Sequence, residues 1–214
     1  MALADPGLAR SPLRALLGAG LLLAFVLANG AAARAEPTPG SASETVRAFY
    51  ATLLDTMQNA AALGPRGRYQ KLEPAVQRAF DLPFMTKLSI GVAWGHLTAD
   101  QKQRAVTAFA RYVTATYANR FDGYEGEKFL VLGEVKIKHG VLVRTQIVKS
   151  DGEPVSINYA THDNDIAWQI RDVYLSGTIS QLATQRSDFS AILRAEGVDG
   201  LIASLNKKAD ALQS

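Results

Sequence analysis

The sequence contains no cysteine. This absence excludes disulfide bonds, a thiolate nucleophile and a lipidated amino-terminal cysteine. Histidine is also scarce, with three residues in the chain. His139 and His162 fall in expected hairpin turns, where polar residues are common, and His96 precedes an expected helix start. We therefore predict that none of the three histidines is catalytic.

Motifs for covalent catalysis and phosphate binding are missing as well. The chain has no G-x-S-x-G turn, no G-x-G-x-x-G and no phosphate loop ending in Lys-Ser/Thr. The segment from His162 to Asp165 lacks the glycine and the distant glutamate of a calcium loop, so it indicates a turn. We predict that the protein is not an enzyme and uses neither a cofactor nor a metal ion.

Long apolar runs are limited to the amino terminus. The run from Leu16 to Leu27 is too short for a comfortable membrane span and follows Arg10 and Arg14. Ala33-Arg34-Ala35 has the form of a signal-peptidase site. We expect residues 1–35 to be a cleaved signal peptide, which predicts a periplasmic protein without a permanent membrane anchor. The A-x-A triplet disfavours the alternative, an uncleaved anchor.

The charge of the chain gives no indication of nucleic-acid binding. Residues 1–35 hold three of the 23 basic and one of the 20 acidic residues, so the remainder carries a formal charge of +1. It shows no basic stripe with interleaved aromatic residues, the pattern expected of a nucleic-acid surface.

The remaining chain is about the length of one domain. Residues 36–43 are rich in Pro, Gly and Ser and are expected to form a flexible arm, followed by a single domain over residues 44–214. Ser41 and Glu44 form a capping box before a helical apolar stripe.

The next part of the chain is also predicted to be helical. Residues 64–97 contain three prolines and several glycines, including Pro65 and Pro74, and should form short helices. Thr98 and Gln101 form a second capping box, which begins the longest predicted helix.

Beyond residue 123 the apolar period changes to two. The pattern predicts four antiparallel strands, joined by turns at His139-Gly140, Asp151-Gly152 and residues 162–165. One apolar face is expected, with these residues on it: Phe129, Val131, Val135 and Ile137; Val141, Val143, Thr145 and Ile147; Val155, Ile157 and Tyr159; Ile166, Trp168 and Ile170.

Helical spacing returns after Ser176 with Ile179, Leu182 and Phe189, and Gly197 separates this helix from a last one. Arg186 is a polar member of the stripe; it either extends from an apolar stem to water or meets a lipid headgroup at a pocket mouth. The predicted fold class is α+β, with a helical amino-terminal layer, a four-stranded antiparallel meander and two carboxy-terminal helices.

Apolar surface is the feature that remains to be explained. A helical layer that does not close completely on the sheet would leave an apolar cavity suited to a lipid chain, although core-lining and pocket-lining residues look alike in a sequence. The candidates for lining a lipid cavity between helices and sheet are Leu88, Val92, Trp94, Phe109, Val113, Tyr117, Val143, Ile157 and Tyr159.

Several segments resemble a known family. These are LTADQKQRAVTAFARYVTATYANRFDGYEGE, IAWQIRDVYLSGTISQLATQRSDFSAIL and GVDGLIASL. They are similar to the MlaC-like toluene-tolerance family of periplasmic lipid-binding proteins. DVYLSGTISQLATQRSDFSAILR looks most similar to the HpnM branch, which is associated with hopanoid biosynthesis.

The resemblance implies an α+β carrier that encloses the apolar part of a lipid and leaves its polar head at the mouth of the cavity. It implies transfer of phospholipid or a hopanoid-type lipid between an inner-membrane ABC-type transporter complex and an outer-membrane acceptor complex. LSGTIS stands where phospholipid carriers usually show a motif nearer to EGVS, so the resemblance leaves the lipid open.

Two alternatives remain at this level. The first is an enzyme of the nuclear-transport-factor-like type, with an isomerase or dehydratase site in its cavity; such a site needs a buried acid or base. The second is an envelope docking module with a solid core, which uses Lys136 and Lys138 or the last helix to bind a partner.

Overall fold

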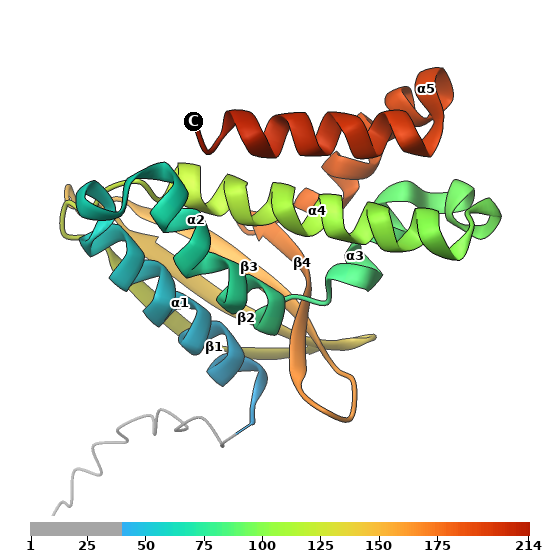
Figure 1. The fold of residues 1–214 in the computed structure, drawn as a ribbon. Helices are drawn as coiled ribbons and strands as arrows, with labels where there is room; N and C mark the ends of the chain where they lie inside the picture. The colour runs from blue at the N-terminus through green and yellow to red at the C-terminus, as the bar shows by residue number, and fades with distance from the viewer. Residues whose placement is uncertain (1–39) are drawn as a thin grey trace, which may run out of the picture. The chain divides into compact units, whose positions relative to one another are not determined.

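The computed structural model describes residues 40–214, so the predicted signal peptide and residues 36–39 lie outside the described residues. The helices are α1 (Ala42–Gln58), α2 (Ala60–Ala79), α3 (Leu82–Ile90), the 3-10 helix η1 (Gly91–His96), α4 (Ala99–Arg120) and α5 (Gln181–Ala211). The strands are β1 (Lys128–Ile137), β2 (Gly140–Val148), β3 (Pro154–Asp163), β4 (Trp168–Leu175) and β5 (Ile179–Ser180) (Figure 1).

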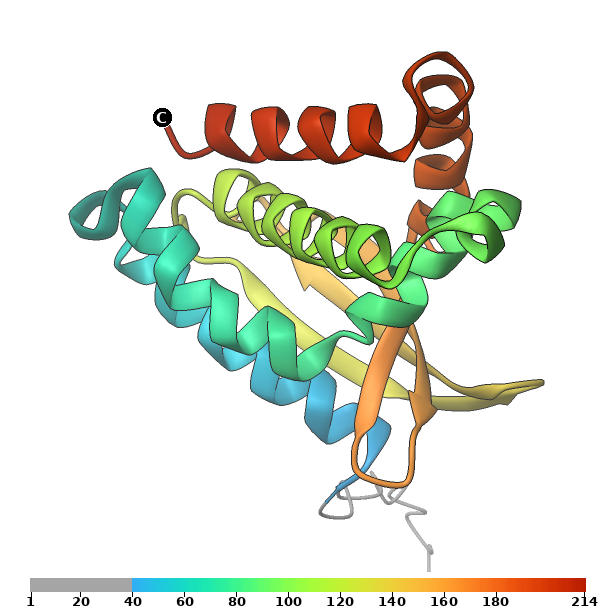
Figure 2. The same ribbon diagram turned by 45° about the vertical axis from the view of Figure 1, so that its right-hand side comes forward.

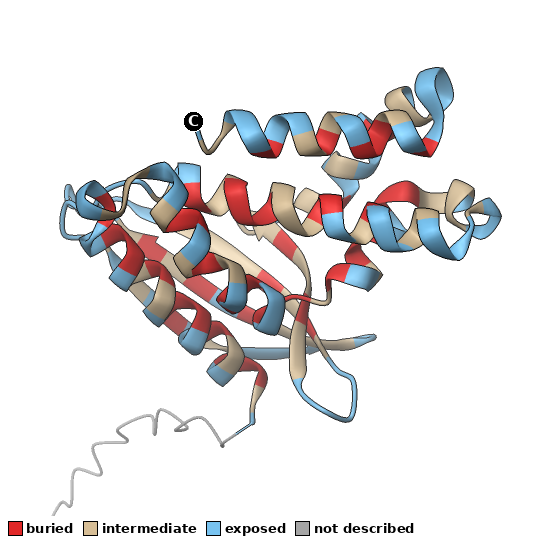
Figure 3. Ribbon diagram, viewed as in Figure 1, coloured by how far each residue is buried: buried red, intermediate tan, exposed pale blue. Residues whose placement is uncertain are grey.

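The order of helices, strands and a final helical segment confirms the predicted α+β class. The strands form one antiparallel sheet in the order β1-β2-β3-β4-β5. Helices α1, α2 and α4 lie on one side of it, and the second part of α5 packs on the outside of α4 (Figures 1 and 2). The buried core contains residues of the helices and of the sheet, and Figure 3 marks the buried residues in red along both.

The first helix begins two residues before the predicted domain boundary. The Ser41 hydroxyl accepts a hydrogen bond from the backbone N–H of Glu44 (3.2 Å), as the capping pattern predicts. Glu134 of β1 adds a second contact, because its Oε1 accepts from the N–H of Ser43 at 2.7 Å. A carboxylate at this end of a helix is favourable, since unpaired N–H groups give the end a partial positive charge.

The prediction of a break at Pro74 was wrong. Helix α2 kinks at Gly64 (φ 61°), where Pro65 starts its longer part, but then continues through Pro74. A proline in a helix leaves the carbonyl four residues earlier without its N–H partner. Both Pro74 and Gln70, which carries that carbonyl, are exposed, so water can replace the missing bond.

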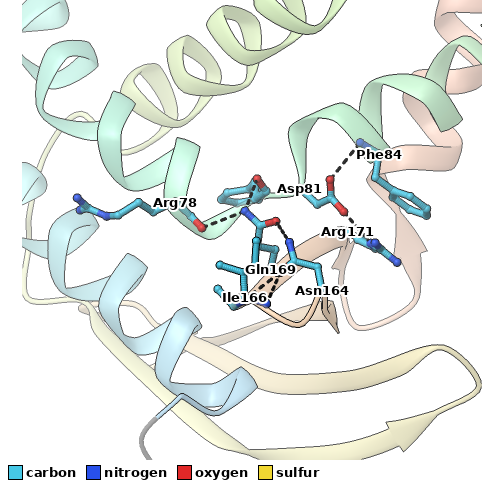
Figure 4. A network of polar contacts seen from close by, with 9 residues as sticks. Arg78, Asp81, Phe84, Asn164, Ile166, Gln169 and Arg171 are labelled. Atoms are coloured by element: carbon cyan, nitrogen blue, oxygen red, sulfur yellow. Dashed lines mark hydrogen bonds and ion pairs between the residues drawn. The ribbon is translucent and has the colours of Figure 1, made fainter.

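The junction between α2 and α3 is attached to β4. Phe80 forms a parallel bridge with Ile170, and the N–H of Asp81 donates to the Ile170 carbonyl at 2.9 Å. The Asp81 carboxylate accepts from the N–H of Phe84 (3.2 Å) and from Nε of Arg171 (2.9 Å). The Arg171 guanidinium also lies 4.1 Å from the centre of the Phe84 ring (Figure 4). These contacts fix where α2 ends and α3 begins relative to the sheet.

The turn before β4 corrects another expectation. Ile166 was predicted to lie in a strand, but it is 92% exposed in the turn, and β4 begins at Trp168. The Asn164 side chain determines the turn: its Oδ1 accepts from the N–H of Ile166 at 3.2 Å, and its Nδ2 donates to Gln169 at 2.9 Å. Gln169 in turn donates to the carbonyl of Arg78 at 3.4 Å (Figure 4).

The sheet has five strands rather than the predicted four. Ser176 (φ 50°) and Gly177 (φ 79°) both have positive φ, and the N–H of Thr178 donates to the carbonyl of Leu175 (3.2 Å). Two residues of positive φ form the tight hairpin turn that suits twisted strands. Ile179 therefore pairs with Leu175 instead of joining a helical stripe, and α5 begins only at Gln181.

A bulge in β1 changes which side chains face the helices. The pairing with β2 shifts between Val131 and Gly133, so that Glu134 lies opposite Val143. Val135, predicted on the apolar face, is consequently turned to the other face and is 43% exposed. The prediction was wrong because alternation along a strand reverses at an inserted residue.

The two predicted carboxy-terminal helices are the two parts of α5. Gly197 (φ 68°) interrupts the helix between them. The second part buries Leu201 and Leu205 and holds α4 through ion pairs, one of which joins Arg104 to Asp199 at 2.8 Å.

Gly140 provides a test of the sheet. Its φ is +126°, and a methyl group there would overlap the Thr161 carbonyl oxygen of β3. We expect Gly140→Ala to lower the free energy of unfolding by about 3 kcal/mol or more. Gly152→Ala is the matched control, since Gly152 also has positive φ (+88°) but has open space around it; it should cost about 1 kcal/mol. Urea denaturation would measure both, and equal losses would contradict the steric argument.

Candidate functional site

A cavity of about 340 Å³ lies between α4 and strands β3 and β4. It exists because α4 packs mainly against α2 and the second part of α5 rather than directly on the sheet. The start of α5 and the α2–α3 junction also contribute lining residues. Its volume is within the range of small-molecule sites.

The interior of the cavity is apolar and aromatic. The residues that line it are Phe80, Met85, Val113, Tyr117, Phe121, Ile157, Tyr159, Val173 and Leu175. An interior of this kind can enclose the apolar part of a lipid.

The mouth of the cavity has a different chemistry. Its polar lining residues are Tyr112, Thr116 and Arg120 of α4 and Gln181, Thr184, Gln185 and Asp188 of α5. Arg120 and Asp188 are both exposed and carry opposite charges. The cavity thus joins an apolar interior to a polar mouth of low net charge.

Buried hydroxyl groups form one wall behind the cavity. The Tyr50 hydroxyl lies 2.6 Å from Oγ1 of Thr145, and the Thr145 hydroxyl donates to the carbonyl of Ile157. Because Thr145 uses its only hydrogen in that bond, Tyr50 must be the donor to Thr145. The Tyr159 ring lies edge-to-face with Tyr50, with centroids 5.7 Å apart. This chain of hydrogen bonds fixes Tyr50 beside the cavity wall.

The tyrosines near the cavity are held in their neutral form. Burial is the largest influence on Tyr50 and raises the pKa of its hydroxyl to about 12. Burial also raises the pKa of Tyr117 and of Tyr159 well above the ordinary value for tyrosine. These hydroxyl groups can form hydrogen bonds, but they are poor general bases at neutral pH.

The structure brings four of the nine candidate residues together. Val113 and Tyr117 of α4 and Ile157 and Tyr159 of β3 line the same cavity. Their contact with a lipid stays a prediction.

The other five candidates lie elsewhere. Phe109 and Val143 are completely buried in the core and do not line the cavity. Leu88 lies near the end of α3 and Val92 lies in η1, and both are exposed, Val92 by 82%. Trp94 is half-buried beside the Lys102 ammonium group, 5.8 Å from the ring centre.

Sequence reasoning missed the polar residues of the mouth. Gln181, Gln185 and Asp188 are spaced at four and three positions, which places them on one side of α5, and this spacing was the available signal. Arg186 was considered instead, but its exposed guanidinium packs over Gly91 and does not line the cavity.

The protein family described as MlaC protein matches residues 47–207 of the chain. The chain belongs to the MlaC family. A solved structure with the same fold is that of the phospholipid-binding protein from Ralstonia solanacearum in complex with a phospholipid. The two share 21% sequence identity at a TM-score of 0.71, over 81% of this chain and 99% of that one. At this identity the likeness establishes the fold of the MlaC chain.

Two kinds of feature are absent from the part of this MlaC chain that the structure describes. None of the helices between residues 40 and 214 combines the length and apolar character needed to cross a bilayer. Within the same range, no three His, Asp or Glu side chains are grouped as ligands for a metal ion.

The raised pKa of Tyr50 predicts a loss of stability at alkaline pH. In the unfolded chain this phenol ionises near pH 10, whereas in the folded protein it ionises near pH 12. This difference in pKa contributes its full stabilisation of the folded state below pH 10. The contribution is lost as the pH rises to about 12, by about 3 kcal/mol in total. The free energy of unfolding should therefore decline between about pH 9 and 11, where this loss begins, and Tyr50→Phe should make that decline smaller.

Chemical denaturation at a series of pH values would test this, with Tyr124→Phe as the control because Tyr124 is exposed. The control should retain the decline of the unchanged protein. An identical decline in both variants would show that Tyr50 does not ionise differently in the folded state.

Proposed function

We propose that the protein is a periplasmic lipid carrier that moves a phospholipid or hopanoid-type lipid between the inner and outer membranes. In this proposal it is the substrate-binding component of an ABC-type lipid transport system. The observation that carries the proposal is the cavity, whose apolar interior opens at a polar mouth in a chain of the MlaC family.

The cavity is suited to tight binding without chemistry. Burial of a chain of about 15 carbons at roughly 0.8 kcal/mol per methylene group would contribute on the order of 12 kcal/mol before the costs of association are subtracted. A carrier needs such a contribution and no reacting group, because lipid exchange is driven by differences in affinity between donor, carrier and acceptor.

Similarity to known proteins and the amino-terminal sequence also support the proposal. The similar protein from Ralstonia solanacearum has this fold and holds a phospholipid. The resemblance of residues 172–194 to the HpnM branch supports a hopanoid-type lipid as the alternative cargo. The signal-like segment before residue 36 supports a periplasmic location, and the family resemblance supports transporter complexes in the two membranes as partners.

The groups around the cavity favour binding over catalysis. Its ionisable lining residues are Arg120 and Asp188 at the mouth, together with tyrosines, and those of the interior, Tyr117 and Tyr159, have a raised pKa. An isomerase or dehydratase would need an acid or base near a reacting carbon in the interior. The cavity also favours a carrier over a docking module with a solid core.

The direct test is mass spectrometry of an organic extract of the mature protein, purified without detergent from the periplasm of its own host. We expect phospholipid or hopanoid in an amount close to one lipid per protein. An extract without lipid, together with no uptake of labelled lipid from vesicles, would overturn the proposal.

A substitution can assign the bound lipid to this cavity. Ile157→Trp should fill part of the cavity with an apolar side chain and reduce the bound lipid about tenfold, without placing a charge in the core. Val135→Trp is the control, because Val135 is exposed on β1 and lies outside the cavity. Both should show cooperative thermal unfolding. Equal lipid content in the two variants would place the ligand elsewhere.

A further inference from the structure

We propose that residues 87–96, which join α3 to α4, bind the surface of a bilayer that contains anionic lipid. This segment, the α3–η1 tip, covers the end of α3 and all of η1. It lies at the edge of the helical layer, on the side away from α1 (Figures 1 and 2). The inference goes beyond the proposed function, since binding to a bilayer surface does not require a lipid cavity.

The first observation is the exposed apolar surface of the tip. Val92 is 82% exposed, and Leu88 near the end of α3 is exposed as well. Trp94 is half-buried, and none of the six residues of η1 is buried. Exposed apolar side chains beside a tryptophan are typical of segments that enter the boundary between lipid headgroups and acyl chains.

The second observation is the positive charge around the tip. Residues 82–99 contain no Asp or Glu. Lys87 is exposed within the tip, and the Lys102 ammonium group lies 5.8 Å from the centre of the tryptophan ring. The exposed Arg186 guanidinium of α5 packs over Gly91, 3.2 Å from the position that a Cβ atom would take there. Three cations therefore lie within the tip or beside it.

These cations are not neutralised by neighbouring acids. No ion pair in the described part of the chain involves Lys87, Lys102 or Arg186. Asp100, the first acid after the tip, is paired with Arg104 at 2.7 Å. The charge of the tip is therefore complementary to an anionic bilayer surface.

The β3–β4 turn combines apolar exposure with the opposite charge. Ile166 in this turn is 92% exposed, more than Val92. Asp163 and Asp165 are exposed acids on either side of it, and an anionic bilayer would repel them. The turn therefore provides a matched control for the tip.

A bilayer fits the tip better than a protein partner does. The exposed apolar side chains of the tip are few, whereas a stable protein interface usually buries about 800 Å² on each partner. A bilayer surface needs less contact, because each Lys or Arg near anionic lipid strengthens binding about fivefold and each apolar side chain adds its own burial.

The tip is also close to the cavity. Met85 lines the cavity from α3, two positions before Lys87. Gln185, next to Arg186, lines it from α5. A chain bound to a bilayer through the tip would therefore hold the cavity near the lipid that it takes up or releases.

The experiment measures co-sedimentation of the mature protein with two kinds of vesicle. One kind is phosphatidylcholine alone, and the other is an equal mixture of phosphatidylcholine and phosphatidylglycerol. We expect at least about tenfold tighter binding to the mixed vesicles. High salt should weaken this binding, because it screens the attraction between exposed charges.

Variants assign the binding to the tip. Val92→Glu places a negative charge in the tip and should weaken binding to the mixed vesicles about tenfold, and Lys87→Gln should weaken it about fivefold. Ile166→Glu, the control, should bind as the unchanged protein does. All three positions are exposed, so the Tm should not change.

Tryptophan fluorescence reports the contact itself. The chain has two tryptophans, so Trp168→Phe leaves Trp94 as the only one. Mixed vesicles with brominated acyl chains should quench the fluorescence of this variant. In Trp94→Phe the remaining Trp168, which lies in β4, should not be quenched. Equal quenching of the two variants would place the bilayer contact elsewhere and overturn the inference.

The other outcomes are also decisive. Absence of binding to the mixed vesicles would overturn the inference, and so would equal binding of Val92→Glu and Ile166→Glu. Binding of the tip to a transporter complex without binding to vesicles would replace the bilayer with a protein partner. A protein that binds vesicles through the tip but takes up no lipid would overturn the proposed function and leave this inference intact.

Discussion

The attachment of the α2–α3 junction to β4 is the constraint on which the site depends. Phe80 and Asp81 pair with Ile170 as if they were a short extra strand, and the Asp81 carboxylate both caps α3 and binds Arg171. The ion pair is largely shielded from water, so loss of either partner would leave a partly buried charge unpaired. With this junction fixed, α2 covers one part of the sheet and α3 leads the chain away from it. Helix α4 then returns beside α2 with α5 packed on its outer side, and the space beneath α4 becomes the cavity.

The aromatic residues determine how far this space can close. Phe49, Phe80 and Tyr117 form a cluster of edge-to-face and tilted rings, with centroids 5.1 to 5.6 Å apart, between α1 and α4. Rings held in such a cluster cannot move into the cavity without loss of these contacts. The hydrogen bonds of Tyr50 and Thr145 fix the opposite wall through β2 and β3. The cavity is therefore bounded by rigid groups, although its lining is mostly apolar.

The elements that could be predicted from the sequence depend on local rules. Capping by Ser41 and Thr98, alternation in β2 and β3 and the interruption at Gly197 each follow from residues within a few positions of one another. The errors at Ile166 and Val135 have a different origin, because a side-chain turn at Asn164 and a bulge in β1 are decided by pairing with distant segments. Apolar periodicity also could not distinguish Phe109 in the core from Val113 in the cavity, since both lie on the same stripe of α4.

Apolar and polar parts of the site would have separate roles in a carrier. Apolar burial is proportional to area and does not depend on direction, so the interior would give affinity for almost any chain that fits. Selectivity for a headgroup would then come from polar groups of the mouth, such as those of Thr184 and Asp188. A carrier must also release its lipid. A mouth with one cation, one anion and neutral hydrogen-bonding groups adds selectivity without the large charge attraction that would slow release. The division between interior and mouth therefore lets affinity and selectivity be set by different residues.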